Sequence, residues 1–185
     1  MEGYPMKFHF KISFFVKLSV ALFVFMSVFA NASSFAQAKS SSFYSKKIHM
    51  SYSQQKYLYQ LTRQRGLDYK ETLAVILHES NFNPKAYSAG NYGYFQINKV
   101  NHRSLAKQLH TKNKPYDPYV NMNWGTYMLS NLTKKYKKKG YRGTKLKEAV
   151  LSAYNKGEGG YARTGKATSY IRAHNKALAY IKKCF

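Results

Sequence analysis

Carboxyl groups are scarce in this sequence, which narrows the search for residues that transfer protons. The 185 residues include seven Asp and Glu against 31 Lys and Arg, and the formal net charge is +24. Glu2 belongs to the N-terminal segment, and three carboxylates stand at expected helix starts, where a negative charge complements the helix dipole: Asp68, Glu71 and Asp117. Glu148 is expected in a first helical turn and Glu158 in an exposed glycine-rich loop. Only Glu79 lacks a structural explanation.

Glu79 combines two surroundings that raise the pKa of a carboxyl group. It follows Val75 and Ile76 on the apolar side of an expected helix, near the carboxyl end, where the dipole disfavours a negative charge. Desolvation acts in the same direction, so we expect a raised pKa. A carboxyl group that stays protonated near neutral pH suits a general acid that breaks a glycosidic bond. The alternative is an ordinary ion pair between Glu79 and one of the 31 basic residues.

Several short motifs begin at Glu79 and follow one another in order. They are Glu79-Ser80, Asn83-Pro84-Lys85-Ala86 with Ser88, Gly93-Tyr94-Phe95-Gln96-Ile97, Asn121 with Gly125, and Ala153-Tyr154-Asn155-Lys156-Gly157. Each motif alone is common, but the ordered set is specific. Together they resemble the catalytic domain of the soluble lytic transglycosylases, and the resemblance covers roughly residues 67–160.

The resemblance implies a mainly α, lysozyme-like fold and a peptidoglycan-cleaving enzyme without cofactor or metal. It implies that Glu79 acts first as acid and then as base, and that no second catalytic carboxylate is needed. The expected product is a 1,6-anhydro-N-acetylmuramic acid end, formed where the bond to N-acetylglucosamine is cut. The substrate-binding residues implied or made plausible by their side chains are Ser80, Ser88, Tyr94, Gln96, Tyr154 and Asn155, with Tyr92 extending an aromatic wall.

The sequence departs from the family's usual pattern at two places. The usual Gly-Leu-Met-Gln segment reads Gly-Tyr-Phe-Gln here, and the usual tyrosine three residues after Gly125 is Met128, with Tyr127 beside it. Both differences bear on how individual sugars are held. The aromatic stripe that includes Trp124 and Tyr136 has the spacing of a helix core, so we interpret it as structural.

Apolar periodicity and capping residues predict a single, mainly α domain with a cleft and at most a short hairpin or loop. Helices are expected over 54–65, from Asp68 to the region 81–84, from Asp117-Pro118 to Gly140, from Thr144 to the glycines at 157–160, and from Thr168 onward. Asp68 and Glu71 have the spacing of a capping box. Residues 87–93 favour a loop or short hairpin, and 94–97 a loop that lines the cleft.

The N-terminus resembles a secretory signal. Lys7 and Lys11 precede an apolar run from Leu18 to Ala30, which would span roughly 20 Å of a bilayer core about 30 Å thick. Residues 1–32 are therefore predicted to be a signal peptide, with a second cut site after residue 38 and an uncleaved anchor as alternatives. Residues 33–50 are predicted to be a flexible linker and 51–185 the domain. The single cysteine, Cys184, excludes a disulfide within the chain.

The positive charge predicts polyanionic surroundings but does not identify them. Two alternatives to the transglycosylase remain: a hydrolytic muramidase, which would need a second carboxylate, with Glu158 poorly placed, and a non-catalytic basic binder of envelope polymer or nucleic acid. The expected partners are peptidoglycan glycan strands and, by analogy, a secretion, conjugation or phage assembly. Nucleic acid is disfavoured by the export signal, and contact with a membrane is expected only through the signal segment.

Overall fold

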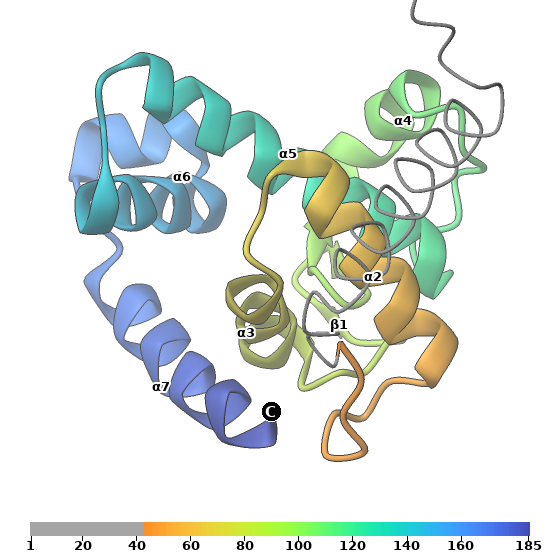
Figure 1. Cartoon of the computed structure of the whole chain (residues 1–185). Helices are drawn as coiled ribbons and strands as arrows, with labels where there is room; N and C mark the ends of the chain where they lie inside the picture. The colour runs from red at the N-terminus through yellow and green to blue at the C-terminus, as the bar shows by residue number, and fades with distance from the viewer. Residues whose placement is uncertain (1–42) are drawn as a thin grey trace, which may run out of the picture. The chain divides into compact units, whose positions relative to one another are not determined.

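The computed structural model describes residues 43–185, so the predicted signal peptide and both cut sites lie outside the described residues. The described chain forms α2 (Tyr52–Arg65), α3 (Tyr69–Ser80), β1 (Tyr87–Ser88), β2 (Asn91–Tyr92), β3 (Ile97–Asn98), α4 (Lys99–Gln108), α5 (Pro118–Lys138), α6 (Gly143–Thr164) and α7 (Thr168–Cys184). Figure 1 shows α3 in the middle, with α7 and α6 on one side and α2 and α4 on the other. The mainly α prediction is confirmed.

The ends of α2 and α3 follow from their capping residues. Ser51 forms a capping box at the start of α2, and Gly66 ends this helix with φ 64°, a conformation that glycine adopts without steric cost. Asp68 accepts a hydrogen bond from the Glu71 amide at the start of α3. The reciprocal half of the predicted capping box is absent, because the Glu71 carboxylate binds Lys147 and His174 instead.

The long helix α5 begins as predicted, whereas α6 differs from its prediction at both ends. The Asp117 side chain accepts hydrogen bonds from two amides in the first turn of α5. Helix α6 begins at Gly143 after Arg142, without a side-chain cap, rather than after Thr144. The chain also stays helical beyond Gly157, which forms a kink with φ 70° instead of ending the helix. A single glycine absorbs the change of direction here, so Glu158 lies on a helical turn and not in a loop.

Helix α4 is an element that the sequence analysis did not predict. Asn98 caps its start by accepting a hydrogen bond from the Val100 amide, and the helix buries His102, Leu105 and Ala106. Its sequence is dominated by polar and basic residues, so the apolar stripe is too short to stand out. The preceding segment forms a three-stranded antiparallel sheet of two-residue strands, in which β2 pairs with β1 and β3. The predicted short hairpin is confirmed.

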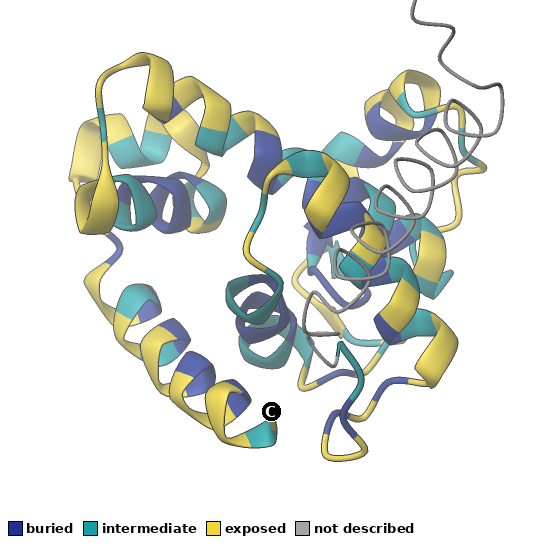
Figure 2. Cartoon of the chain, viewed as in Figure 1, coloured by how far each residue is buried: buried dark blue, intermediate teal, exposed yellow. Residues whose placement is uncertain are grey.

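The core is built around α3, whose middle is completely enclosed. Leu73, Ala74 and Ile76 each have 0% exposure. Helix α7 packs a stripe of buried residues toward α3 and leaves its outer side exposed, as Figure 2 shows. Trp124 and Tyr136 are buried on α5, which confirms their structural interpretation. No helix within residues 43–185 has the length and apolarity needed to cross a membrane.

Residues 43–50 pack onto the domain, so the predicted flexible linker is wrong in this part. Ile48 and Met50 are buried in the core. The side chain of Gln55 bonds to the backbone of residues 45, 48 and 50, and the hydroxyl of Ser45 donates to the carbonyl of Cys184. A buried glutamine inside α2 thus orders the segment before the helix. The remaining linker residues, 33–42, lie outside the described part of the chain.

Candidate active site

The end of α3 opens into a cavity of about 800 Å³, within the usual size range of ligand sites. Its walls come from the sheet, α4, α5 and α6, with Glu79 at the end of α3. The lining residues are Glu79, Ser88, Asn91, Gln96, Ile97, Asn98, Asn101, Met128, Asn131, Leu132, Ala153, Tyr154, Asn155, Lys156, Gly157 and Glu158. Amide and hydroxyl side chains are frequent among them, and such groups can hydrogen-bond the hydroxyl and acetamido groups of sugars.

Glu79 keeps the position that its sequence predicted. It lies in the last turn of α3, and the left-handed residue Asn81 ends the helix directly after it. The pKa of Glu79 is raised to about 7, because the effect of burial exceeds the opposite effect of the hydrogen bond from Tyr170. The Tyr170 hydroxyl lies 2.5 Å from Oε1 of Glu79. The carboxyl group therefore titrates near neutral pH, where a general acid or base is most effective.

The other described carboxylates all have structural partners. Asp68 and Asp117 cap helices. Glu71 pairs with Lys147 and His174, Glu148 with Lys166, and Glu158 with Lys135. Within residues 43–185, no Lys, Arg or His forms a salt bridge with Glu79. An ordinary ion pair therefore does not explain this residue, although 27 Lys and Arg are available in the same part of the chain.

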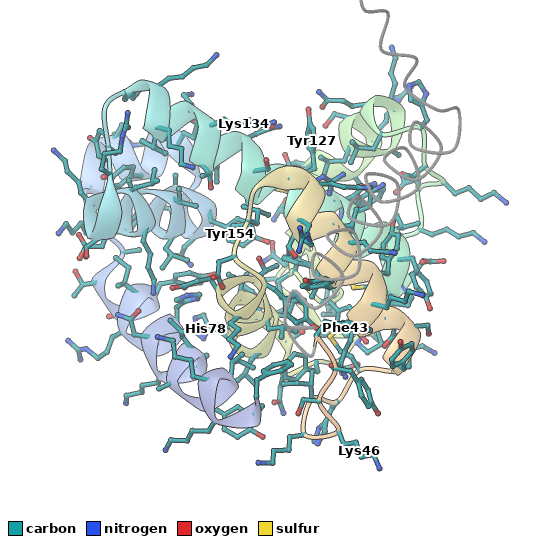
Figure 3. All side chains as sticks on the ribbon, in the orientation of Figure 1. Phe43, Lys46, His78, Tyr127, Lys134 and Tyr154 are labelled. Carbon is teal, nitrogen blue, oxygen red and sulfur yellow. The ribbon has the colours of Figure 1, made fainter. Side chains whose placement is uncertain are left out.

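Two tyrosines lie close to Glu79, one expected from the sequence and one not. Tyr154 lines the cavity and donates a hydrogen bond to the carbonyl of Phe95 at 2.7 Å. Figure 3 shows Tyr154 between α6 and the end of α3. Burial, with the charge of Glu79, raises the pKa of Tyr154 and Tyr170 well above their ordinary value, so both hydroxyls stay protonated. Tyr170 was missed because it lies 91 positions from Glu79, and its only sequence signal was its place in the last helix.

The loop from Gly93 to Gln96 is fixed against α5 by close contacts. Gly93 has φ 72°, and a Cβ atom there would lie 2.5 Å from the amide nitrogen of Asn121. The side-chain amide of Asn121 accepts from the Phe95 backbone and donates to the carbonyls of Tyr92 in β2 and Pro115 before α5. A Cβ atom on Gly125 would lie 2.1 Å from the Phe95 ring. These contacts explain the spacing between the Gly93 motif and the pair Asn121 and Gly125.

Four of the predicted substrate-binding residues line the cavity with Glu79: Ser88, Gln96, Tyr154 and Asn155. Gln96 has φ 45°, and its amide donates to the carbonyls of Ala86 and Gly93, which fixes the side chain against the loop. Ser80 is not among the lining residues, and its hydroxyl donates to the carbonyl of Ile76.

The prediction that Tyr94 contacts substrate is not supported by its position. Its side chain is 2% exposed, and its hydroxyl donates to Gln54 on α2. Tyr92 packs against His102 and two tyrosines, Tyr87 and Tyr116, rather than forming an aromatic wall of the cavity. Tyr94 and Phe95 both enter the core, and the chain turns at Gln96, whose φ of 45° accompanies the placement of its side chain in the cavity lining.

Most of the polar lining outside the motifs was not predicted from the sequence. Asn91, Asn98, Asn101 and Asn131 come from four different elements, and only the fold brings them together. Met128 lines the cavity at the position where the resembling family usually has tyrosine, and Tyr127 instead lies beside Arg65. In residues 43–185 no three His, Cys, Asp or Glu side chains are grouped closely enough to hold a metal ion.

Comparisons with known proteins place the chain in a family. Residues 56–177 match the family model described as the Transglycosylase SLT domain. The chain is 34% identical over 113 residues to the membrane-bound lytic murein transglycosylase C of Salmonella arizonae, covering 56% of this chain and 31% of that protein. The protein of the same name from Actinobacillus succinogenes is 33% identical over 111 residues, covering 55% of this chain and 30% of its own length. The chain thus matches under a third of these relatives.

Two solved structures share the fold. The 70 kDa soluble lytic transglycosylase of Escherichia coli superposes with a TM-score of 0.52 at 20% identity, covering 73% of this chain and 23% of that one. An inactive variant of the lytic transglycosylase Slt of Pseudomonas aeruginosa superposes with a TM-score of 0.51 at 18% identity, covering 72% of this chain and 22% of that one. The predicted lysozyme-like fold is thereby confirmed.

Proposed function

The chain belongs to the Transglycosylase SLT domain family, and from this premise we propose that it is a peptidoglycan lytic transglycosylase with Glu79 as its catalytic residue. The observation that carries the proposal is the state of Glu79. It is a carboxyl group with a pKa of about 7, without a cationic partner in the described chain, at the wall of an amide-lined cavity. The relatives named as lytic murein transglycosylases support the choice of substrate.

In the proposed reaction Glu79 acts twice. The protonated carboxyl group gives its proton to the glycosidic oxygen between N-acetylmuramic acid and N-acetylglucosamine, and the bond from that oxygen to the anomeric carbon breaks. The resulting carboxylate takes the proton of the muramoyl 6-hydroxyl, whose oxygen then bonds to the anomeric carbon. No water is consumed, and Glu79 ends protonated. A pKa near 7 suits both steps, because the group must donate and accept a proton at the same pH.

The residues around Glu79 have proposed roles that follow from their positions. Tyr170 donates to one carboxyl oxygen, which orients the group. Ser88, Gln96 and Asn155 line the cavity and are proposed to hydrogen-bond the sugars. Tyr154 is anchored through its hydroxyl, so its ring is proposed to form a fixed wall near the acid. Ser80 and Tyr94 are proposed to act only by supporting the local fold, since neither lines the cavity.

The direct test replaces Glu79 with Gln, which keeps the shape of the side chain and removes the transferable proton. Wild type is expected to release 1,6-anhydro-muramoyl fragments from purified peptidoglycan, detected by mass spectrometry. Glu79→Gln should lower the rate by a factor of about 10² to 10⁴, because the amide of Gln cannot transfer the proton. Circular dichroism of the variant controls for unfolding. Near-normal turnover by a folded Glu79→Gln variant would refute the assignment.

Hydrolytic cleavage is a second candidate, which one observation favours. Glu158, expected in an exposed loop, lines the same cavity as Glu79. A hydrolase with two carboxylates would use one of them to activate water. Glu158 is, however, held in an ion pair by Lys135 at the solvent-exposed side of the cavity. Reducing ends in place of anhydro ends, together with loss of activity in Glu158→Gln, would establish hydrolysis.

Export to the cell envelope is proposed from the sequence of residues 1–32, with cleavage after residue 32 or 38. The names of the relatives, which are membrane-bound murein enzymes, agree with this location. A role beside a secretion, conjugation or phage assembly is proposed by analogy alone. The intact mass of the protein recovered from an envelope fraction tests the processing. A non-catalytic basic binder would show wall binding without any muropeptide release.

A further inference from the structure

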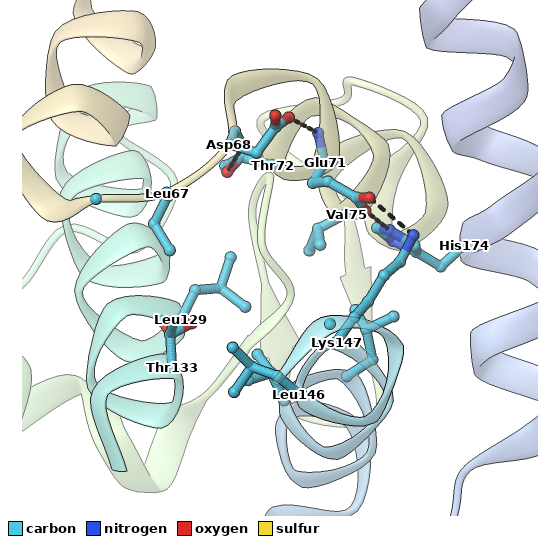
Figure 4. A pocket seen from close by; sticks show the side chains of 14 residues that line it. Leu67, Asp68, Glu71, Thr72, Val75, Leu129, Thr133, Leu146, Lys147 and His174 are labelled. Atoms are coloured by element: carbon cyan, nitrogen blue, oxygen red, sulfur yellow. Dashed lines mark hydrogen bonds and ion pairs between the residues drawn. The ribbon is translucent and has the colours of Figure 1, made fainter. Parts of the chain in front are cut away.

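We propose that the pair formed by Glu71 and His174 is a positioning device for the hydrogen bond that Tyr170 donates to the candidate acid. The inference rests on the proposed function, since it assigns a purpose to the state of the carboxyl group. Glu71 and His174 do not line the active-site cavity, so they are positioning residues and not catalytic ones. Both belong instead to a smaller apolar pocket of about 200 Å³, shown in Figure 4.

The same two helices carry both contacts. Tyr170 and His174 are four residues apart on α7, which places them on one face of the helix. That face meets α3, where Glu79 stands in the last turn and Glu71 in the first. The Tyr170 hydroxyl lies 2.5 Å from the Glu79 carboxyl, and Nε2 of His174 lies 2.7 Å from Oε2 of Glu71. A shift or rotation of α7 that breaks one contact therefore strains the other.

The remaining buried stripe of α7 is apolar. Two other hydrogen bonds fix the ends of the helix, from the Ala167 amide to Ser152 and from Ser45 to the Cys184 carbonyl. Ala177, Leu178 and Ile181 complete its buried stripe. Apolar contacts are non-directional, so they favour close packing without selecting one rotation of the helix. A hydrogen bond does select one, because its strength depends on distance and angle; here the donor His174 is buried and the Glu71 side chain is 34% exposed. His174 is 1% exposed, so the loss of its bond to Glu71 would leave a buried ring without a polar partner.

The bond to Glu71 is the only hydrogen bond of the His174 ring within the described chain. A carboxylate oxygen accepts, so Nε2 of the ring carries the proton. Nδ1 is buried and has no hydrogen-bond partner among residues 43–185. The other oxygen of Glu71 accepts from Lys147 of α6 at 2.8 Å. Burial alone raises the pKa of Glu71, but the hydrogen bonds and charges of His174 and Lys147 together outweigh it and leave this pKa lowered. Figure 4 shows the three side chains meeting from α3, α6 and α7.

Other titratable groups also lie beside Tyr170 and Glu79. His78 of α3 contacts the Tyr170 ring with centroids 4.6 Å apart, and burial and the charge of His174 lower its pKa. Figure 3 shows His78 between α3 and α7. Tyr154 of α6 lies near Glu79 and stays protonated because burial raises its pKa. Among these groups, only Tyr170 donates a hydrogen bond to the carboxyl group.

The effect of the Glu71–His174 pair can be measured as the pKa of Glu79, without an activity assay. The hydrogen bond from Tyr170 lowers the pKa of Glu79 against the larger effect of burial. A displaced Tyr170 would therefore let that pKa rise above about 7. The complete chain contains five glutamates, so ¹³C labelling of glutamate gives few carboxyl signals in an NMR titration. The signal of Glu79 is assigned by its disappearance in Glu79→Gln.

The key variant is His174→Phe, which keeps a ring of similar shape but cannot donate to Glu71. We expect the Glu79 pKa to rise in this variant, by up to roughly one pH unit, the shift expected from loss of one hydrogen bond to a charged group. Tyr170→Phe should raise it by the same amount or more. The double variant should show no further rise, because both changes remove one interaction. His174→Gln, which retains a donor, should stay near wild type.

Three further variants keep the test decisive. Lys147→Met removes the outer partner of Glu71 and should leave the Glu79 pKa unchanged. Ile181→Val loosens α7 without touching a polar group and should also leave it unchanged. Glu71→Met breaks the pair from the other side and replaces His174→Phe if that variant does not fold. An unchanged Glu79 pKa in a folded variant lacking the pair, or additive rises in the double variant, would overturn the proposal. Absence of anhydro products from wild type would instead count against the proposed function.

Discussion

At the scale of the residue, the raised pKa of Glu79 follows from its burial without a basic partner among residues 43–185. A charged carboxylate could have found a lysine almost anywhere on so basic a chain, yet the end of α3 offers it only buried surroundings and the tyrosine hydroxyl of α7. Burial favours the protonated form, and the hydrogen bond favours the charged form. Their difference leaves a group that changes its charge near neutral pH, which a surface ion pair would prevent.

The activity should follow the protonation of Glu79. An acid that must begin protonated loses effectiveness as the pH rises through its pKa, which is about 7. We expect kcat/KM for release of muropeptides to fall above that pH by a factor of ten per unit. Rates measured from pH 5 to 9 at constant ionic strength check this. A rate that stays flat to pH 9 would contradict the raised pKa.

The same shift makes a prediction about stability. The folded pKa of Glu79, about 7, exceeds the ordinary value of 4.5, so between these values the folded state holds more protons than the unfolded state. The free energy of unfolding therefore decreases as the pH rises from about 4.5 to 7, by at most about 3 kcal/mol. Gln does not titrate, so Glu79→Gln should not show this decrease in the free energy of unfolding. Urea unfolding should show the variant more stable than wild type at pH 8 and nearly equal at pH 4.5. Equal stabilities at both pH values would show that Glu79 is not desolvated.

Glu79, Tyr170 and Tyr94 show which parts of the site could be predicted from the sequence. The position of Glu79 followed from its place on a short apolar helix, because local periodicity and capping decide it. Tyr170 could not be found in this way, since its partner lies across the contact between α3 and α7. Tyr94 was assigned to the cavity because it shares a motif with Gln96, but the chain turns between them and Tyr94 lies in the core with Phe95.

At the scale of the element, the starts of α3 and α5 were predictable from the capping residues Asp68 and Asp117. A side-chain cap was not sufficient elsewhere, because α4 was not predicted although Asn98 caps its start. Ser51, Asp68 and Asp117 each hold a first turn through a hydrogen bond. Helix α6 starts without such a bond, and its continuation past Gly157 depends on contacts that no local pattern reports. The segment before Ser51 was judged flexible from its composition, although a single buried glutamine of α2 orders it.

The packing of Phe95 on α5 provides a test at this scale. Gly125 leaves no room for a side chain, because a Cβ atom would lie 2.1 Å from the Phe95 ring. Gly125→Ala should therefore lower the free energy of unfolding by about 1–3 kcal/mol and reduce activity by displacing the loop that carries Gln96. The matched control is Gly159→Ala, also helical, whose nearest neighbour would be the end of the Arg163 side chain at 3.5 Å. The control should be neutral or slightly stabilising. Urea unfolding distinguishes them, and equal effects would contradict the tight contact.

At the scale of the whole molecule, charge and fold have separate functions. The fold gathers amide side chains and Glu79 into the cavity, while Lys156 is the one Lys or Arg of residues 43–185 among the lining residues. Five lysines stand between Lys134 and Lys139 at the end of α5, where positive charge also complements the helix dipole. Figure 3 shows Lys134 there. The lysines serve the helix locally and contribute to the long-range field at the same time.

That field should govern how the protein associates with its proposed substrate, peptidoglycan. Peptidoglycan peptides carry carboxylates, so the cationic surface is expected to attract the polymer over distances that salt screens, about 10 Å at 0.1 M ionic strength. The inactive Glu79→Gln variant is suited to the measurement, since it should bind without digesting the wall. Its retention on purified peptidoglycan should fall steeply between low and high salt, whereas retention on neutral chitin should be weak and less dependent on salt.

Changing Lys137, Lys138 and Lys139 to Glu should reduce retention at low salt and flatten its salt dependence. Salt-independent retention would show instead that contacts in the cavity, and not the surface charge, dominate binding.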